Sequence, residues 1–120
     1  MNDKIYIRDL LVYANIGVEE PERTHVQPLI INIELALDLT KAGQSDHIHD
    51  TVNYQTVIER VLELIQQSRC RLLEKLAVMI AELILRDFNT AEVKIRIDKN
   101  SVSPVAKAVG VEIIRKGIIC

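Results

Sequence analysis

The chain has 120 residues, a formal net charge of −2, and a composition that is 48% apolar but only 3% aromatic. This length predicts one domain over residues 1–120, with a core built mainly of leucine, isoleucine and valine. The charge balance, without any run of basic residues, argues against a nucleic-acid partner, and no apolar stretch of about 18 residues is present to span a membrane.

The first residues carry no secretion-signal pattern, since charged side chains recur early and no long apolar stretch follows. The two cysteines are Cys70, which lies between two arginines, and Cys120 at the end of the chain. We therefore expect a cytoplasmic protein with two free thiols.

Alternating apolar residues predict two strands in the first third of the chain. The first runs from about Lys4 to Tyr13, and a bulge or bend near Asp9-Leu10 could shift the parity of its apolar side chains. The second runs from Leu29 to Leu39, where every odd-numbered residue is apolar. The apolar residues on one parity of the first strand are Ile5, Ile7, Leu11 and Tyr13.

Two helices are predicted by apolar residues at helical spacing. The first begins at Tyr54, behind Asn53 as a capping residue, and the second begins near Leu73. Asn89 could end the second helix in a left-handed conformation. The first stripe is Tyr54, Val57, Ile58, Val61, Leu62 and Ile65, and the second is Leu73, Leu76, Ala77, Ile80, Leu83 and Ile84.

Two further strands are predicted around Val93–Ile97 and Val109–Ile113, which gives the order β-β-α-α-β-β. The simplest architecture is an α+β fold, with an antiparallel four-stranded sheet and two helices on one face. Apolar residues that one helical layer would leave uncovered predict self-association. These residues are Ile30, Ala36, Ile114, Ile118 and Ile119.

Lys99 is the most informative polar residue, because it follows Val93, Ile95 and Ile97 with the same parity and so points toward the core. Desolvation disfavours the charged ammonium and would suit the side chain to proton transfer. The alternative is a lysine whose stem packs while its charged end reaches water.

Three other side chains could belong to a functional site, but each also has a plain structural interpretation. Glu74 could accept two parallel N–H bonds from a ligand, or could simply favour the N-terminus of its helix. Tyr54 has the spacing of a core residue, although a buried hydroxyl would need a partner. Glu22 lies in a charged stretch that is solvated by default.

The stretch Asp46–Asp50 contains two histidines and two aspartates, but no further ligand at matching spacing. We therefore expect no metal site. No glycine-rich phosphate loop and no nucleophile elbow is present either.

Several segments in this order and spacing resemble the dihydroneopterin aldolase family over nearly the whole chain. Residues 16–27 include Ile16-Gly17-Val18-Glu19-Glu20, Glu22 and Gln27. The other segments are 38–46 (DLTKAGQSD), 50–54 (DTVNY), 72–77 (LLEKLA), 97–99 (IDK) and 109–113 (VGVEI).

The resemblance implies a tunnelling fold, in which subunits join their sheets edge to edge into a ring. The ring is usually a tetramer, and two rings stack as an octamer. Such closure would cover the apolar residues that the helical layer leaves uncovered, and it would pair the open sheet edges. Family active sites lie between neighbouring subunits, so the site residues would come from two chains.

Carried over by position, Glu74 would anchor the pterin ring with help from the backbone of Leu73. Tyr54, with backbone groups of Val52 and Asn53, would line the ring from the neighbouring subunit. Lys99 would be the proton donor and acceptor, and Tyr54 would share the catalytic site. Glu22 would hold a side-chain hydroxyl or an ordered water.

The implied reaction is a retro-aldol cleavage of 7,8-dihydroneopterin, a step of folate biosynthesis. The substrate carries its own electron sink, so no cofactor, Schiff base or metal is expected. The same site could also epimerise C2′.

Two alternatives remain at this stage: a dihydroneopterin triphosphate epimerase and a non-catalytic pterin-binding ring protein. A triphosphate substrate would want a basic cluster, which is not evident. The stretch 100–108 lacks the proline-rich turn with Gly-His that many family members have, and this leaves open how the pocket closes.

Overall fold

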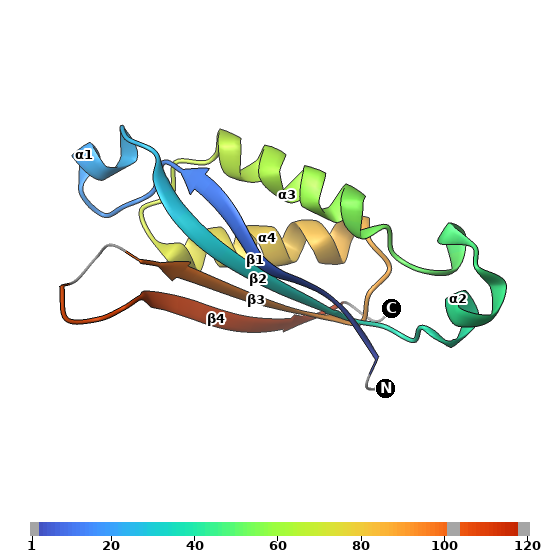
Figure 1. Ribbon diagram of the computed structural model, residues 1–120. Helices are drawn as coiled ribbons and strands as arrows, with labels where there is room; N and C mark the ends of the chain where they lie inside the picture. The colour runs from blue at the N-terminus through green and yellow to red at the C-terminus, as the bar shows by residue number, and fades with distance from the viewer. Residues whose placement is uncertain (1–2, 101–103, 118–120) are drawn as a thin grey trace.

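The computed structural model describes residues 3–100 and 104–117, which form one four-stranded antiparallel sheet in the order β1-β2-β3-β4. Two long helices lie side by side on one face of the sheet, and the other face carries no helical layer (Figure 1). The main elements follow the predicted order β-β-α-α-β-β, so the predicted α+β architecture is confirmed. Their bounds are β1 Lys4–Ala14, β2 Gln27–Ala36, α3 Tyr54–Gln67, α4 Leu73–Asp87, β3 Glu92–Lys99 and β4 Val109–Lys116.

Three short helical segments were not expected from the sequence: α1 Glu20–Arg23, α2 Thr40–Ser45 and η1 Ile48–Asp50. They contain no buried residue. Without an apolar stripe, they leave no periodic signal in the sequence. No described helix is both long enough and apolar enough to cross a membrane.

The core lies between the sheet and the two long helices. The inward side chains of β2 and β3 are completely buried because helices cover both central strands. Each such Leu, Ile or Val stabilises the fold by about 1.5–3 kcal/mol relative to an exposed position. The fully buried strand residues are Leu29, Ile31, Ile33, Leu35, Val93, Ile95 and Ile97, and the helices add Val57, Val61, Ile80 and Ile84.

A β-bulge interrupts β1 between Ile7 and Leu10, as the sequence suggested. Asp9 has a positive φ of 55°, and its N–H donates to Oδ1 of Asn32 at 2.9 Å. The extra residue reverses the parity, so Leu11 turns outward with 51% exposure. The apolar residues that point inward after the bulge are Leu10, Val12 and Ala14.

The predicted second strand, Leu29–Leu39, was placed too far along the chain, because the ladder starts at Gln27 and ends at Ala36. Leu37 donates its N–H to the Asp3 carbonyl at 3.2 Å, directly beyond the last pair of the ladder, Lys4 and Ala36. The Asp38 carboxylate then accepts from the Thr40 N–H at 2.9 Å and starts α2. A local side-chain bond thus ends a strand that apolar alternation alone would continue.

Other expectations about individual residues have mixed outcomes. Asn53 caps α3 as predicted, since its side chain accepts from the Gln55 N–H at 3.1 Å. Asn89 does not stop α4, because the helix ends at Asp87 and Phe88 follows in an extended conformation. The thiol of Cys70 is free, whereas Cys120 lies outside the described residues.

The apolar residues that were predicted to be left uncovered by the helices are only partly exposed. Ile114 is 52% exposed on the face without helices, while Ile30 and Ala36 are half-buried. Ile118 and Ile119 lie outside the described residues.

Candidate active site

Lys99 occupies the last position of β3, between Leu29 of β2 and Val109 of β4. Its residue exposure is 8%, so the predicted inward orientation is correct. Its Nζ donates to Oε2 of Glu22 at 3.0 Å. A lysine at a strand end is thus paired with a carboxylate 77 positions earlier in the chain.

Glu22 lies in α1, on the connection between β1 and β2, and is half-buried rather than fully solvated. Its second oxygen, Oε1, accepts from the Glu19 N–H at 3.2 Å. The hydrogen bond from Lys99, then the Glu19 N–H and the lysine charge, hold the pKa of the Glu22 carboxyl below its ordinary value. Glu22 therefore faces Lys99 as an anion.

Gly17 makes room for this carboxylate. It has a φ of +153°, and a Cβ at this position would collide with the Cβ and carboxyl group of Glu22. Such a backbone conformation is strongly disfavoured for residues other than glycine. The glycine thus allows the Glu22 side chain to pack directly against the main chain on its way to Lys99.

Two long polar side chains hold the connection in shape. Arg23 donates through Nη1 to the carbonyls of Gly17 and Val18, both at 2.9 Å. Gln27 donates through Nε2 to the Ile16 carbonyl at 2.7 Å and to the Glu22 carbonyl at 3.1 Å. These bonds tie both ends of the connection together and fix the position of Glu22. The sequence alone indicated no role for Arg23, Gln27 or Gly17, although Gly17 and Gln27 belong to the family-like segment 16–27.

Leu73 and Glu74 begin α4 at the same end of the molecule as α1 and the end of β3 (Figure 1). The Gly17 N–H donates to the Cys70 carbonyl at 3.2 Å and so links the β1–β2 connection to the segment that precedes α4. Glu74 is exposed, as a carboxylate that binds a ligand has to be. The structure therefore gathers Glu22, Lys99 and the start of α4 at one end.

Val52, Asn53 and Tyr54 lie at the start of α3, at the other end of the molecule (Figure 1). The 14 residues of α3 separate the two ends by about 21 Å. Tyr54 is 59% exposed, so the interpretation of this ring as core is wrong. Its spacing matches the apolar stripe, but the first buried side chain of α3 is Val57, one turn further along the helix.

Tyr54 and Val52 line a mainly apolar hollow of about 480 Å³. The N-terminal part of β1 and the α2 region form the rest of its wall. Its other lining residues are Lys4, Ile5, Tyr6, Leu39, Ala42, Gly43, Ile48 and Thr51. One chain alone does not bring this hollow to Lys99.

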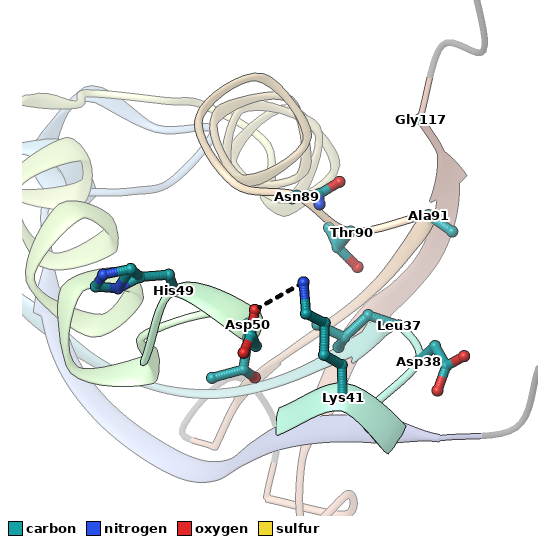
Figure 2. A pocket seen from close by; sticks show the side chains of 10 residues that line it. Leu37, Asp38, Lys41, His49, Asp50, Asn89, Thr90, Ala91 and Gly117 are labelled. Carbon is teal, nitrogen blue, oxygen red and sulfur yellow. Dashed lines mark ion pairs between the residues drawn. The ribbon is translucent and has the colours of Figure 1, made fainter. Parts of the chain in front are cut away.

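A larger hollow, of about 640 Å³, lies beside α2 and contains none of the predicted site residues. Figure 2 shows Lys41 directed toward Asp50 across it, at 3.3 Å, with Thr90 and Asn89 on the opposite wall. Asp50 also accepts from the Ser45 hydroxyl. Lys41 and Asp50 are already paired with each other, and within residues 3–100 and 104–117 no cluster of three or more His, Cys, Asp or Glu side chains could hold a metal ion. The size of this hollow therefore does not make it the better candidate.

Comparisons with known proteins point to one family. A family model described as dihydroneopterin aldolase matches residues 5–114. The dihydroneopterin aldolase of Staphylococcus epidermidis is 38% identical over 120 aligned positions, which cover 97% of this chain and 98% of that protein.

Two solved structures are similar over nearly their full length. One is the Escherichia coli dihydroneopterin aldolase in complex with neopterin, with 37% identity, a TM-score of 0.90, and coverage of 94% of this chain and 98% of the other. The other is the dihydroneopterin aldolase of a Burkholderia species bound to guanine, with 26% identity, a TM-score of 0.82, and coverage of 97% and 92%.

Proposed function

The chain belongs to the dihydroneopterin aldolase family, and we infer from this premise that it is a carbon–carbon lyase of folate synthesis. We propose that it converts 7,8-dihydroneopterin into 6-hydroxymethyl-7,8-dihydropterin and glycolaldehyde. The observation that carries the proposal is the buried Lys99 paired with Glu22 at 3.0 Å, at the same end of the tunnelling fold as Glu74.

The reaction is a retro-aldol cleavage. A base removes the proton from the 2′-hydroxyl, and the C1′–C2′ bond breaks as glycolaldehyde leaves. The bonding electrons enter the C6=N5 imine while N5 takes up a proton. The enol-like intermediate is then protonated at C1′ while N5 gives up its proton, which restores the C6=N5 imine and gives the hydroxymethyl product. Each step moves only protons and electron pairs within the substrate, so positioned proton carriers are sufficient.

Lys99 is the group we propose to move these protons. Its burial at the end of β3 supports this role, since the amine would lie next to a substrate whose ring is held at the start of α4. The paired Glu22 would hold the amine in position and bind a side-chain hydroxyl or an ordered water. Because the hydrogen bonds of Arg23 and Gln27 fix the Glu22 loop, the pair is preorganised before substrate arrives.

Glu74 is the proposed anchor of the pterin ring. A carboxylate can accept two parallel N–H bonds, from the 2-amino group and the adjacent ring N–H, in the geometry of an arginine fork. The exposure of Glu74 in the first turn of α4 leaves both oxygens accessible to such a ligand. The backbone of Leu73 would add a contact to the same edge of the ring.

The other side of the ring is proposed to come from a second copy of the chain, in a ring that is tetrameric or doubled to an octamer. Val52, Asn53 and Tyr54 are too far from Lys99 to share a site with it in one chain. The exposed Tyr54 ring beside an apolar hollow suits a flat heterocycle, and its hydroxyl could take part in proton transfer. We place the working enzyme in the cytoplasm.

The test is to incubate the purified protein with 7,8-dihydroneopterin and to measure glycolaldehyde together with the pterin product. Release of both in equal amounts, without added metal or cofactor and in the presence of a chelator, is the expected result. Recovery of a C2′ epimer would reveal the additional epimerase activity. If only the triphosphate reacts, giving its 2′-epimer without any glycolaldehyde, the lyase proposal is wrong.

A further inference from the structure

The face of the sheet that carries no helix bears a ladder of alternating charges, one from each strand. Lys4 Nζ of β1 lies 2.9 Å from Glu34 Oε1 of β2. Lys94 Nζ of β3 lies 3.8 Å from Glu34 Oε2 and 3.7 Å from Glu112 Oε1 of β4. We call these four residues the charge ladder. Exposed ion pairs of this kind add little to the stability of one chain. Stability alone therefore does not explain why the charges alternate in order across all four strands.

The ladder ends in opposite charges on the two open edges of the sheet. Lys4 is on the edge strand β1 with a side-chain exposure of 55%, and Glu112 is on the edge strand β4 with 46%. Both edges also expose large apolar side chains. These are Tyr6, Leu11 and Tyr13 on β1, and Val109 and Ile114 on β4. Each edge thus offers unpaired backbone, apolar surface and a charge that the other edge complements.

We propose that the two end charges of the charge ladder, Lys4 and Glu112, select the register in which β4 of one copy pairs with β1 of the next, with Glu112 beside Lys4 of the neighbour. The occupant of each edge is thus a second copy of this chain. This inference rests on the ring of subunits in the proposed function and adds which residues fix its geometry.

The strand register shows why charge can choose among the alternatives. Straight across the sheet, Lys4 is level with Ala36, then Glu92, then Lys116. A joint that continued this row would place Lys4 of the neighbour beside Lys116, two like charges that disfavour pairing. Because side chains alternate between faces, only shifts by an even number of residues keep Lys4 on the same face. A shift of two places it beside Ile114, and a shift of four places it beside Glu112.

A shift of four residues also agrees with the geometry of a closed sheet. Each copy contributes four strands and would add a stagger of four residues, so the ratio of stagger to strand number is one. Eight-stranded barrels with a shear of eight have this ratio and a strand tilt of about 36°. A joint without any shift would give no stagger, and a closed sheet requires one.

The shift has a consequence for the active site. It moves the neighbour by about 14 Å along β4 toward the end at which Lys99 lies. The part of the neighbour that moves this way is the end with Lys4 and Tyr6, which also line the hollow beside Tyr54. The register chosen by the ladder is therefore the one that carries the Tyr54 hollow toward the Lys99–Glu22 pair.

Charge-swapped variants test the inference. Lys4→Glu alone and Glu112→Lys alone each create a like-charge joint, and we expect the concentration needed for half-assembly to rise at least about tenfold. Mixing the two single variants should restore assembly, because each then supplies the edge that the other lacks. With one variant labelled with heavy nitrogen, native mass spectrometry should find equal numbers of both in every ring.

Each single substitution also places like charges inside its own chain, next to Glu34 or Lys94. The double variant K4E/E112K keeps both of these internal clashes but restores an opposite-charge joint, so it should assemble by itself. Glu34→Gln is the matched control, since it breaks the ladder inside the chain and leaves both edge charges unchanged, and it should assemble like the unaltered protein. Circular dichroism establishes that each variant is folded.

Single variants that assemble as well as the unaltered protein would overturn the inference. So would a mixture of folded single variants, or a folded double variant, that fails to regain assembly. If either result is found while the unaltered protein assembles and releases glycolaldehyde, the inference about the charge ladder is wrong and the proposed function stands. If the unaltered protein is active as a monomer, both the proposal of a site shared between copies and the inference about the charge ladder are wrong.

Discussion

Replacement of Gly17 by alanine should damage both the fold and the catalytic pair, because two independent penalties act at this position. The φ of +153° strains any residue with a Cβ, at a cost of about 2 kcal/mol. For a chain of this size, that strain lowers Tm by roughly 6–10 °C. The added methyl group also overlaps the Glu22 side chain, so the carboxylate has to move away from Lys99.

The kinetic effect follows from the displacement. A shift of about 1 Å in a catalytic constellation can lower turnover by roughly a hundredfold. We therefore expect kcat for glycolaldehyde release to fall by one to two orders of magnitude, while binding of the pterin ring through Glu74 changes much less. The assay combines thermal unfolding with steady-state kinetics and a fluorescence titration of the pterin product.

Gly43→Ala is the matched control. Gly43 lies in α2, and a Cβ there meets no atom within 4 Å. Alanine in a helix is favoured over glycine by about 0.5–1 kcal/mol, so this variant should gain slightly in Tm. It is a control for stability only, because Gly43 also lines the hollow beside Tyr54. If Gly17→Ala behaves like Gly43→Ala in thermal unfolding and keeps its full kcat, the packing of Glu22 against the main chain does not matter and the reasoning is refuted.

Four other outcomes are expected. Lys99→Ala should retain pterin binding but lose about 10²–10⁴ in kcat, and undiminished turnover would remove Lys99 from the mechanism. Glu74→Ala should weaken pterin binding about a hundredfold by calorimetry, since two hydrogen bonds to a charged group are lost; unchanged affinity would place the ring elsewhere. The pKa of Glu22 lies below the ordinary value of a glutamate, so its stabilising pair with Lys99 is present above that ordinary value and is lost as the pH falls through the lowered pKa. The Tm advantage of the unaltered protein over Glu22→Gln should accordingly disappear in acid, and an advantage independent of pH would contradict the pairing. Equal mixing of inactive Lys99→Ala and Tyr54→Ala chains should restore about a quarter of the sites if each site takes one residue from each of two copies, whereas no recovery after confirmed subunit exchange would argue for a site within one chain.

Much of the fold could be predicted from the sequence, because apolar alternation and helical stripes record which side of each element is buried. β2 and β3 show this well, since their inward residues are buried and their outward residues, apart from Ile30, are polar or small. The pattern failed where a local bond overrode it. Asp38 ends β2 by bonding Thr40, and an alternating pattern contains no information about that bond.

The site was predictable only in part, for a related reason. Parity alone placed Lys99 correctly at the inner end of β3. Its partner could not be found by spacing, because Glu22 reaches it from a connection shaped by Arg23, Gln27 and the conformation of Gly17. The prediction of Tyr54 as a core residue is wrong because helical spacing does not tell at which turn burial begins, and the first buried residue of α3 is Val57. The roles of these residues came from resemblance to the family, not from their positions.

The bulge at Asp9 has a further consequence for how copies of this chain can add to one another. Two complementary edges on one molecule could in principle join without limit into an open fibre. A bulge bends an edge strand and increases its twist, and here it interrupts β1 after only four residues of regular ladder, Lys4–Ile7. A flat, uninterrupted edge would accept any extended chain, whereas this edge presents a short regular segment before it turns away. The single extra residue thus works against fibrous polymerisation while leaving room for a limited, curved assembly.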